Sequence, residues 1–341
     1  MASGPSQQPE EDPAKFSRKW HIPYHSLSSL RRDISPVHDL LALFQILALI
    51  RREKPAILHT HTTKAGILGR IAGRVTRTQT IHTPHGHLFY GYFGKGKEKL
   101  YVFLERLAAR FCERIITISE DERRAYLRRG IGNKKKVVTI YNGIDIGRFP
   151  GDGKGLRKEL GTARQIPLVG YVGRLEEIKG PHLFIDAAKR IKALAPQTHF
   201  LMLGDGAMKE ELLQKAQEMS HVHILGYRED VADCLAALDI LLIPSLNDGF
   251  NLVAVEAMAS SKPIVATAVG GLPEVIGDGG IMVRSGDSTQ MAQEAIKLLN
   301  SPTVREKIGM KGRRRAETLF SWDVCLQKTL AIYRQVLGNT R

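Results

Sequence analysis

The sequence predicts an α/β protein with two doubly wound domains, each built on a parallel sheet. Short apolar runs alternate with helical patterns between residues 55 and 141, and such alternation is typical of a parallel sheet covered by helices on both faces. A glycine-containing stretch at 142–155 interrupts the pattern and is typical of a linker. The alternation restarts at residue 167, which indicates a second domain.

The elements follow in the order that such folds require. We expect strands at 56–60, 79–83, 114–119, 136–141, 167–172, 199–203, 222–225, 240–243, 263–267 and 280–283. We expect helices at 64–75, 97–112, 121–129, 181–194 and 322–336, with others in the remaining gaps. The domains are then 20–150 and 151–320, with 321–341 forming a last helix that returns to the first domain. Residues 1–19, rich in Pro, Glu and Gln, are expected to be a disordered tail.

Composition excludes several classes of protein. Hydrophobic residues make up 43% and charged residues 25% of the 341 residues, as in soluble globular proteins. No apolar run reaches the ~18 residues that span a bilayer. The three cysteines are isolated, so we expect neither a disulfide framework nor a zinc site, and a reducing cytoplasm is the expected compartment.

The positive charge is concentrated in the first half of the chain. Residues 1–150 contain 26 Lys and Arg against 13 Asp and Glu, whereas residues 151–341 contain 24 against 22. This asymmetry predicts an anionic partner for the first half: anionic lipid, a phosphorylated substrate or nucleic acid. We do not expect nucleic acid, because the sequence contains no motif that reads it.

The segment 244–258, PSLNDGFNLVAVEAM, carries the strongest functional signal. A strand is expected to end just before it and a helix to begin near Asn251, a good N-cap residue, so free N–H groups and the positive helix end would face an anion. Asp248 in the loop and Glu256 in the helix can accept hydrogen bonds from sugar hydroxyls, although a capped turn with a surface glutamate would look the same. The neighbouring residues expected at the ligand are Gly249, Phe250, Asn251 and Leu252.

A second signal is GYVGRLEEIKG at 170–180. A strand ends at Gly173, and Arg174 and Lys179 follow in the loop. Two cations beside a helix start can clamp a diphosphate, whereas the alternative is that both are solvated surface charges. Their place after the first strand of the second domain favours the clamp.

A third signal is the run IHTPHGH at 81–87, again just after a strand. His85 and His87 are two residues apart, which does not match the usual spacing of zinc ligands, and no acidic residue is close. We therefore expect no metal here and interpret His85 as a hydrogen-bond donor that lines a cleft. His59 and His61 end the preceding strand, and they either line the same edge or simply close the strand.

Together these segments resemble the retaining family 4 glycosyltransferases of the GT-B fold. The resemblance rests on GRLEEIKG at 173–180, the turn Gly204-Asp-Gly206, the Asp248–Glu256 pair and VGGLPE at 269–274. In the first half it rests on HTHTTKAGILGR at 59–70, TPHG at 83–86 and YNGID at 141–145. It runs from about residue 22 to residue 337, and the order and spacing of the motifs make it specific.

The resemblance implies roles for individual residues. Arg174 and Lys179 would bind the donor diphosphate and stabilise the leaving group without a metal or another cofactor; the sequence contains no Asp-x-Asp triplet. Asp248 would contact the transferred sugar, Glu256 the ribose, and His85 the donor sugar from the first domain. Further residues expected to line the donor site are Gly173, Gly204 and Tyr227.

Two features depart from the family pattern. Asp248 stands where the family usually has glutamate, so its carboxylate reaches about 1.5 Å less far. No strand and glycine-rich loop of the usual kind precedes residue 20. We therefore expect the first domain to lack its first strand–helix–strand unit and to be unstable, so that transfer is weak.

The expected activity is transfer of a hexose or N-acetylhexosamine from a nucleoside diphosphate sugar, with UDP as the expected nucleotide, to a hydroxyl acceptor. The expected acceptor is a lipid-linked saccharide at the inner membrane face, in cell-envelope polysaccharide synthesis, with the basic half on the anionic membrane surface. Two alternatives remain open. One is a nucleotide-sugar epimerase of the same fold, and the other is an inactive truncated relative that still binds nucleotide.

Overall fold

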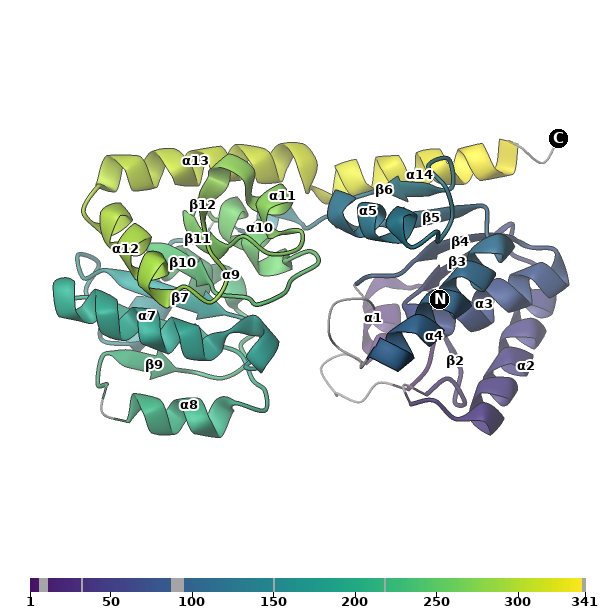
Figure 1. The fold of residues 1–341 in the computed structure, drawn as a ribbon, viewed down its shortest axis with the longest axis horizontal. Coiled ribbons are helices and arrows are strands. Elements are labelled where there is room, and N and C mark those ends of the chain that lie inside the picture. The colour runs from purple at the N-terminus through teal and green to yellow at the C-terminus, as the bar shows by residue number, and fades with distance from the viewer. Residues whose placement is uncertain (6–11, 32, 87–94, 150, 218, 339–341) are drawn as a thin grey trace. The chain divides into compact units, whose positions relative to one another are not determined.

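The computed structural model describes residues 1–5, 12–31, 33–86, 95–149, 151–217 and 219–338. The chain forms two compact units, each shown in Figure 1. Unit 1 comprises Met1–Ile118, Arg123–Thr139 and Thr329–Arg341, and unit 2 comprises Ser119–Glu122 and Ile140–Lys328. Within the described residues, none of the helices combines the length and the apolar character that crossing a bilayer requires.

Unit 1 is built on a parallel sheet of four strands in the order β3-β4-β5-β6. These strands are β3 (Ile57–His61), β4 (Gln79–Thr83), β5 (Arg114–Thr117) and β6 (Val137–Thr139). The helices between and beside them are α2 (Pro36–Glu53), α3 (Thr63–Thr76), α4 (Lys95–Ala108) and α5 (Glu120–Arg128). The strand–helix alternation that the sequence predicted is therefore present in this unit.

Glycine and a buried ion pair fix helix α3 on this sheet. A Cβ on Gly66 would lie 2.2 Å from the ring of His82 on β4, so only glycine allows the helix this close. Arg70, one turn further along α3, is fully buried and binds both carboxylate oxygens of Glu105 on α4 at 2.8 and 2.9 Å. A buried charge is tolerated only when it is paired in this way.

The N-terminal segment differs from the expected disordered tail in the part that the structure describes. Strand β1 (Ala2–Ser3) pairs in parallel with β2 (His25–Ser26), and helix α1 spans Pro13–Trp20. The side chain of Asp12 caps this helix by accepting a hydrogen bond from the N–H of Ala14 at 2.9 Å. Composition alone predicted disorder, because a helix cap depends on one side chain at one position and not on the overall composition of the segment. Residues 6–11 of the expected tail lie outside the described residues.

Unit 2 is built on a parallel sheet of six strands in the order β12-β11-β10-β7-β8-β9. The strands are β7 (Leu168–Val172), β8 (His199–Leu203), β9 (Val222–Ile224), β10 (Ile240–Ile243), β11 (Ile264–Thr267) and β12 (Gly280–Val283). The helices that connect and cover them are α6 (Lys154–Glu159), α7 (Pro181–Leu194), α8 (Lys209–Ala216), α9 (Val231–Ala237), α10 (Leu252–Ala259), α11 (Leu272–Ile276), α12 (Ser288–Leu299) and α13 (Pro302–Leu319). The strand order changes direction between β7 and β10, and doubly wound sheets bind ligands beyond the carboxyl ends of the strands at that point.

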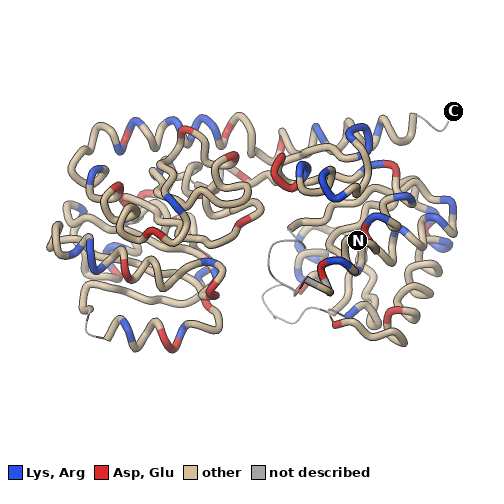
Figure 2. Tube along the Cα trace, viewed as in Figure 1, with Lys and Arg blue, Asp and Glu red and all other residues tan. Residues whose placement is uncertain are grey.

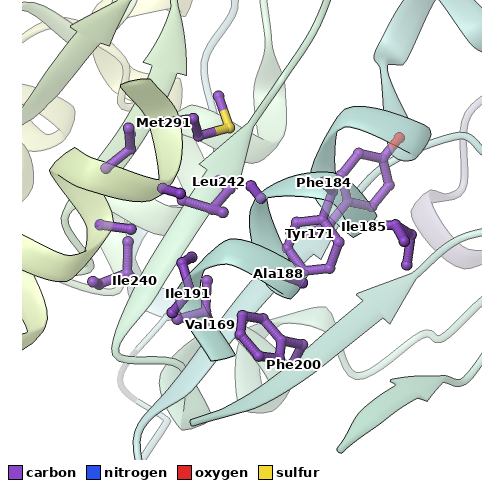
Figure 3. Packing of buried hydrophobic residues seen from close by; sticks show 14 of the residues in the cluster. Val169, Tyr171, Phe184, Ile185, Ala188, Ile191, Phe200, Ile240, Leu242 and Met291 are labelled. Carbon is purple, nitrogen blue, oxygen red and sulfur yellow. The ribbon is translucent and has the colours of Figure 1, made fainter. Parts of the chain in front are cut away.

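The core of unit 2 explains why its strands are nearly continuous apolar runs. Side chains of β7, β8 and β10 meet those of α7 and α12 in the packing of Figure 3. Val169, Phe200, Ile240 and Phe184 are all fully buried in it. A sheet covered on both faces has no polar side, so its strands lack the alternation of a half-exposed strand.

Unit 2 begins earlier than the predicted domain boundary at residue 150. The N–H of Ile144 donates to the carbonyl of Phe320 at 2.8 Å, and that of Trp322 donates to the carbonyl of Ile144 at 3.0 Å. Tyr141 packs against Phe320 with ring centroids 5.3 Å apart. These contacts tie the predicted linker to the end of α13. The last helix, α14 (Trp322–Gly338), begins in unit 2 and ends in unit 1.

Candidate functional site

The loops that follow β7, β8, β10 and β11 lie at the carboxyl edge of the unit 2 sheet, and their backbones contact one another directly. A Cβ on Gly180 would lie 2.2 Å from the carbonyl oxygen of Pro244, and one on Gly204 would lie 1.9 Å from that of Gly173. Both glycines have positive φ, +66° and +137°. Side chains at these positions would clash and would strain the backbone, so glycine is what allows the loops to meet.

The loop after β11 meets the loop after β10 in the same way. Gly270 and Gly271 lie so close to it that added Cβ atoms would be 2.0 Å from the carbonyl oxygen of Asp248 and 2.1 Å from that of Gly249. The N–H of Gly271 also donates to the carbonyl of Asp248 at 2.9 Å. The loop after β11 therefore holds the backbone that carries Asp248. The VGGLPE motif is evident in the sequence, but this role of its glycines depends on a contact between loops that the sequence does not show.

Asp248 is the most connected side chain of this edge. Only 6% of it is exposed, and its Oδ2 accepts hydrogen bonds from Lys179 Nζ at 2.8 Å, Asn251 Nδ2 at 2.7 Å and Ser245 Oγ at 3.2 Å. Within the described residues, every hydrogen bond of this carboxylate goes to that one oxygen. Its other oxygen, Oδ1, is thereby left for a ligand hydroxyl. Sequence reasoning did not identify Ser245, whose only signal was its place three residues before Asp248.

The two cations of the predicted clamp have different environments. Lys179 ends the short 3₁₀ segment Glu177–Lys179, its side chain is 20% exposed, and it contacts the carboxylate of Asp248. The side chain of Arg174 is 57% exposed and pairs with Glu176 at 2.7 Å. The structure thus brings Lys179 and Asp248 together, although the sequence analysis gave them separate partners. Each cation already has an acidic neighbour with which an anionic ligand would compete.

Asn251 caps helix α10, as the sequence predicted. Its Oδ1 accepts a hydrogen bond from the N–H of Ala254 at 2.8 Å, while its amide nitrogen binds Asp248. Leu252 begins the helix and is 43% exposed. Phe250, by contrast, is 9% exposed and packs between Tyr141 and Phe320. Its side chain therefore belongs to the packing of unit 2, and only its backbone can serve a ligand.

Glu256 lies within α10 and is half-buried. Burial raises the pKa of its carboxyl to about 7, an effect that the nearby positive charge of Arg148 only partly offsets. A carboxyl with this pKa changes between donor and acceptor near neutral pH, and either form can bind a pair of neighbouring hydroxyls.

The remaining predicted residues of unit 2 lie around the loops of β8 and β9. The N–H of Gly204 donates to the carbonyl of Gly226 at 2.7 Å, which brings the chain after β9 to the same edge. Tyr227 follows directly and is 63% exposed. Gly173 and Gly204 contribute by close backbone approach, and Tyr227 offers a free aromatic face.

In unit 1, His85 follows β4 and lies beside His61 of β3. Its Nε2 is 2.8 Å from Nδ1 of His61, and the rings stack with centroids 5.0 Å apart. His85 has a φ of +57°, an uncommon backbone conformation for a residue with a side chain. Among the described residues, no group of three or more His, Cys, Asp or Glu side chains could hold a metal ion. His87 lies outside the described residues.

Comparisons with known families match both halves of the chain. Residues 166–301 match the family described as glycosyl transferases group 1, and residues 3–143 match the glycosyl transferase 4-like domain. One relative is the Escherichia coli UDP-Gal:alpha-D-GlcNAc-diphosphoundecaprenol alpha-1,3-galactosyltransferase, which is 33% identical over 253 residues. That match covers 71% of this chain and 65% of the relative's length.

Two further comparisons also match the chain to glycosyltransferases. The capsular polysaccharide biosynthesis glycosyltransferase CapM of Staphylococcus aureus is 28% identical, over 91% of this chain and 85% of its own. The solved structure of Anabaena HepE in complex with UDP superposes with a TM-score of 0.82 at 25% identity, covering 94% of this chain and 89% of that one. The same Anabaena protein has been solved with UDP-glucose. The architecture of two Rossmann-like units with parallel sheets is thus that of the GT-B glycosyltransferases.

Replacement of Glu256 by Gln should make the chain more stable than wild type at about pH 8. The pKa of about 7 lies above the ordinary 4.5, so the folded chain holds a proton that the unfolded chain releases. Wild-type stability should therefore fall as the pH rises from about 4.5 to about 7, and level off above. The gain in Glu256→Gln at pH 8 should be at most about 3 kcal/mol.

Urea unfolding at about pH 5 and pH 8 measures this difference, with Glu210→Gln as the control because Glu210 is an exposed glutamate. The same pH dependence in Glu256→Gln as in wild type would contradict the raised pKa.

Proposed function

Because the chain belongs to the group 1 glycosyl transferases, we propose that it transfers a hexose or N-acetylhexosamine from a UDP-sugar to a hydroxyl acceptor. The transfer proceeds with retention of anomeric configuration and without a metal ion, as the family resemblance implies. The observation that carries the proposal is the Lys179–Asp248 pair, which glycine-dependent loop contacts hold at the carboxyl edge of the unit 2 sheet.

The pair suits a donor that has both a diphosphate and a sugar. When the diphosphate binds, its negative charge competes with Asp248 for the ammonium group of Lys179. Arg174 on the same loop is exposed and can reorient from Glu176 toward the same anion. Cations placed where negative charge develops on the leaving diphosphate lower the barrier to its departure. Asp248, still bound by Ser245 and Asn251, then accepts a hydrogen bond from the transferred sugar.

The other residues of unit 2 fit the nucleotide. Glu256 binds the ribose hydroxyls, since a carboxyl in either protonation state can bind a diol. The glycines Gly173, Gly204 and Gly249 let the backbone approach the phosphates, and the amide groups that precede α10 add hydrogen-bond donors. Tyr227 lies beside the same loops. For His85 of unit 1, the family resemblance implies a hydrogen bond to the transferred sugar.

The proposed acceptor is a lipid-linked saccharide of cell-envelope polysaccharide synthesis. Support comes from the two bacterial relatives, one named for a diphosphoundecaprenol acceptor and the other for capsular polysaccharide biosynthesis. An epimerase of the same fold remains the second enzymatic possibility. It would convert the donor sugar without any acceptor, so one assay with and without acceptor distinguishes the epimerase from the transferase.

That assay incubates the chain with UDP-galactose, UDP-glucose or UDP-N-acetylglucosamine and α-D-GlcNAc-diphosphoundecaprenol, in the presence of EDTA. The proposal predicts UDP release that depends on the acceptor and an α-linked product by NMR. Lys179→Ala and Arg174→Ala should each lower kcat by about 10²–10³, as removal of one oxyanion donor does. Lys189→Ala is the matched control, because Lys189 is exposed on α7.

Wild-type rates in both clamp variants would contradict the proposed roles of the two cations. Activity lost in EDTA and restored by a divalent cation would contradict the metal-free mechanism. Sugar conversion without an acceptor would favour the epimerase.

We also propose that unit 1 binds anionic membrane surfaces. Figure 2 shows Lys and Arg spread over several helices of this unit, and the first 150 residues carry an excess of 13 positive charges. Helix α1 adds Phe16 and Trp20, which are 51% and 50% exposed, next to Arg18 and Lys19. Basic residues near an anionic bilayer contribute about 1 kcal/mol each, and aromatic rings favour its interface.

Sedimentation with phosphatidylglycerol vesicles tests this. Binding should be strong at low salt, weaken as salt screens the charges, and fall several-fold in a Phe16→Ser, Trp20→Ser double variant. Leu194→Ser is the control, since Leu194 is 73% exposed in unit 2. No sedimentation at low salt, or equal loss in the control, would contradict the proposal.

A further inference from the structure

Three histidine rings lie in a row at the carboxyl edge of the unit 1 sheet. His59 and His61 come from β3, with ring centroids 4.3 Å apart, and His85 follows the adjacent strand β4. The His61 and His85 rings stack at 5.0 Å. The parallel pairing of β3 with β4 places His61 opposite Thr83, two residues before His85, and so brings these rings together.

Both ring nitrogens of His59 are occupied. Nδ1 lies 2.7 Å from the hydroxyl of Tyr333 on α14, and Nε2 lies 2.8 Å from the hydroxyl of Thr83. His59 therefore packs against the His61 ring in a tilted arrangement and does not compete for its nitrogens. His61 uses Nδ1 for one hydrogen bond, to Nε2 of His85 at 2.8 Å.

The three rings are neutral near pH 7. Burial, together with the neighbouring histidines, lowers the pKa of His59 to about 3 and that of His61 to about 4. Burial also lowers the pKa of His85. A neutral imidazole has one donor nitrogen and one acceptor nitrogen. The hydrogen bond between His61 and His85 therefore couples the two rings. The ring that donates in this bond has an acceptor as its other nitrogen, and the ring that accepts has a donor as its other nitrogen.

We propose that His61 donates its Nδ1–H to Nε2 of His85 and so holds His85 in the tautomer that carries its proton on Nδ1. The outer nitrogen of His85 is then a permanent neutral donor, suited to a hydroxyl or ring oxygen of the transferred sugar. This assigns His61 as a positioning residue that acts through His85, and it rests on the proposed transferase function. The hydrogen bond that one histidine nitrogen makes sets the protonation of the other nitrogen, and so gives it a single role.

The left-handed backbone at His85 is consistent with this assignment. A residue with a side chain at a φ of +57° is held there against its own preference. With this backbone conformation the ring lies beside His61, where Nε2 takes the hydrogen bond to His61 and Nδ1 remains for a ligand.

A matched pair of substitutions separates the two possible proton positions. In His61→Asn the amide nitrogen replaces Nδ1 and can still donate to Nε2 of His85. In His61→Asp the carboxylate can only accept, so in neutral His85 it places the proton on Nε2. Nitrogen-15 NMR of the histidine rings in the full chain reads the tautomer of His85 directly, with or without activity.

The proposal predicts the Nδ1–H tautomer of His85 in wild type and in His61→Asn, and the Nε2–H tautomer in His61→Asp. The kcat for sugar transfer should stay near wild type in His61→Asn and fall about tenfold or more in His61→Asp, the equivalent of one lost hydrogen bond. KM for the acceptor should not change, since the proposal assigns this nitrogen to the donor sugar and not to the acceptor.

A second histidine pair in unit 2 provides the control. His199 Nδ1 and His223 Nε2 are 3.2 Å apart, with stacked rings whose centroids are 5.5 Å apart, on β8 and β9. His199→Asp should place a carboxylate beside Nε2 of His223 in the same way and leave transfer at the wild-type rate.

An Nε2–H tautomer of His85 in wild type would overturn the proposal, as would a tautomer that His61→Asp does not change. A changed tautomer with unchanged kcat would overturn the positioning role. If wild type shows the predicted tautomer and its change in His61→Asp but no transfer to any acceptor, the proposed transferase function fails and the tautomer assignment stands.

Discussion

The site of unit 2 depends on how closely its loops approach one another at the carboxyl edge of the sheet. Gly180, Gly204 and Gly270 each stand where a Cβ would lie within 2.2 Å of a backbone carbonyl oxygen, and each has a positive φ. Larger residues would push the loops after β7, β8, β10 and β11 apart. The contacts decide where Lys179 meets Asp248, because those side chains belong to two of these loops. The close approach of these backbones thus determines where the charges of Lys179 and Asp248 lie relative to each other.

The same edge carries acidic and basic side chains whose charges the chain's own residues neutralise only in part. Asp248 gathers three hydrogen-bond donors on one oxygen, and Arg174 and Lys179 are held by carboxylates that an anion can replace. Glu256 is half-buried and is ionised only at the expense of stability, since burial raises its pKa to about 7. Groups whose environments are this unfavourable for charge concentrate at functional sites. A diphosphate with a ribose and a sugar would match the cations and the carboxyls together.

Much of this could be predicted from the sequence. The strands and the main motifs lie where local patterns placed them, because apolar runs between turn residues are local signals, and Asn251 caps α10 as its residue type indicates. Partners that are distant in the chain could not be predicted. The Lys179–Asp248 pair joins residues 69 apart, and the packing of Phe250 against Tyr141 and Phe320 depends on the tertiary fold. The predicted absence of a first strand–helix–strand unit, with the instability it implies, stays a prediction.

Lys179 and its loop are proposed to recognise a diphosphate, and calorimetric titration with UDP and UMP measures this recognition. Wild type should bind UDP at least about tenfold more tightly than UMP, because the second phosphate adds a charge-assisted contact. In Lys179→Met that preference should largely disappear, while UMP binding stays close to wild type. Equal affinities of wild type for the two nucleotides, or a full preference for UDP in Lys179→Met, would contradict the account.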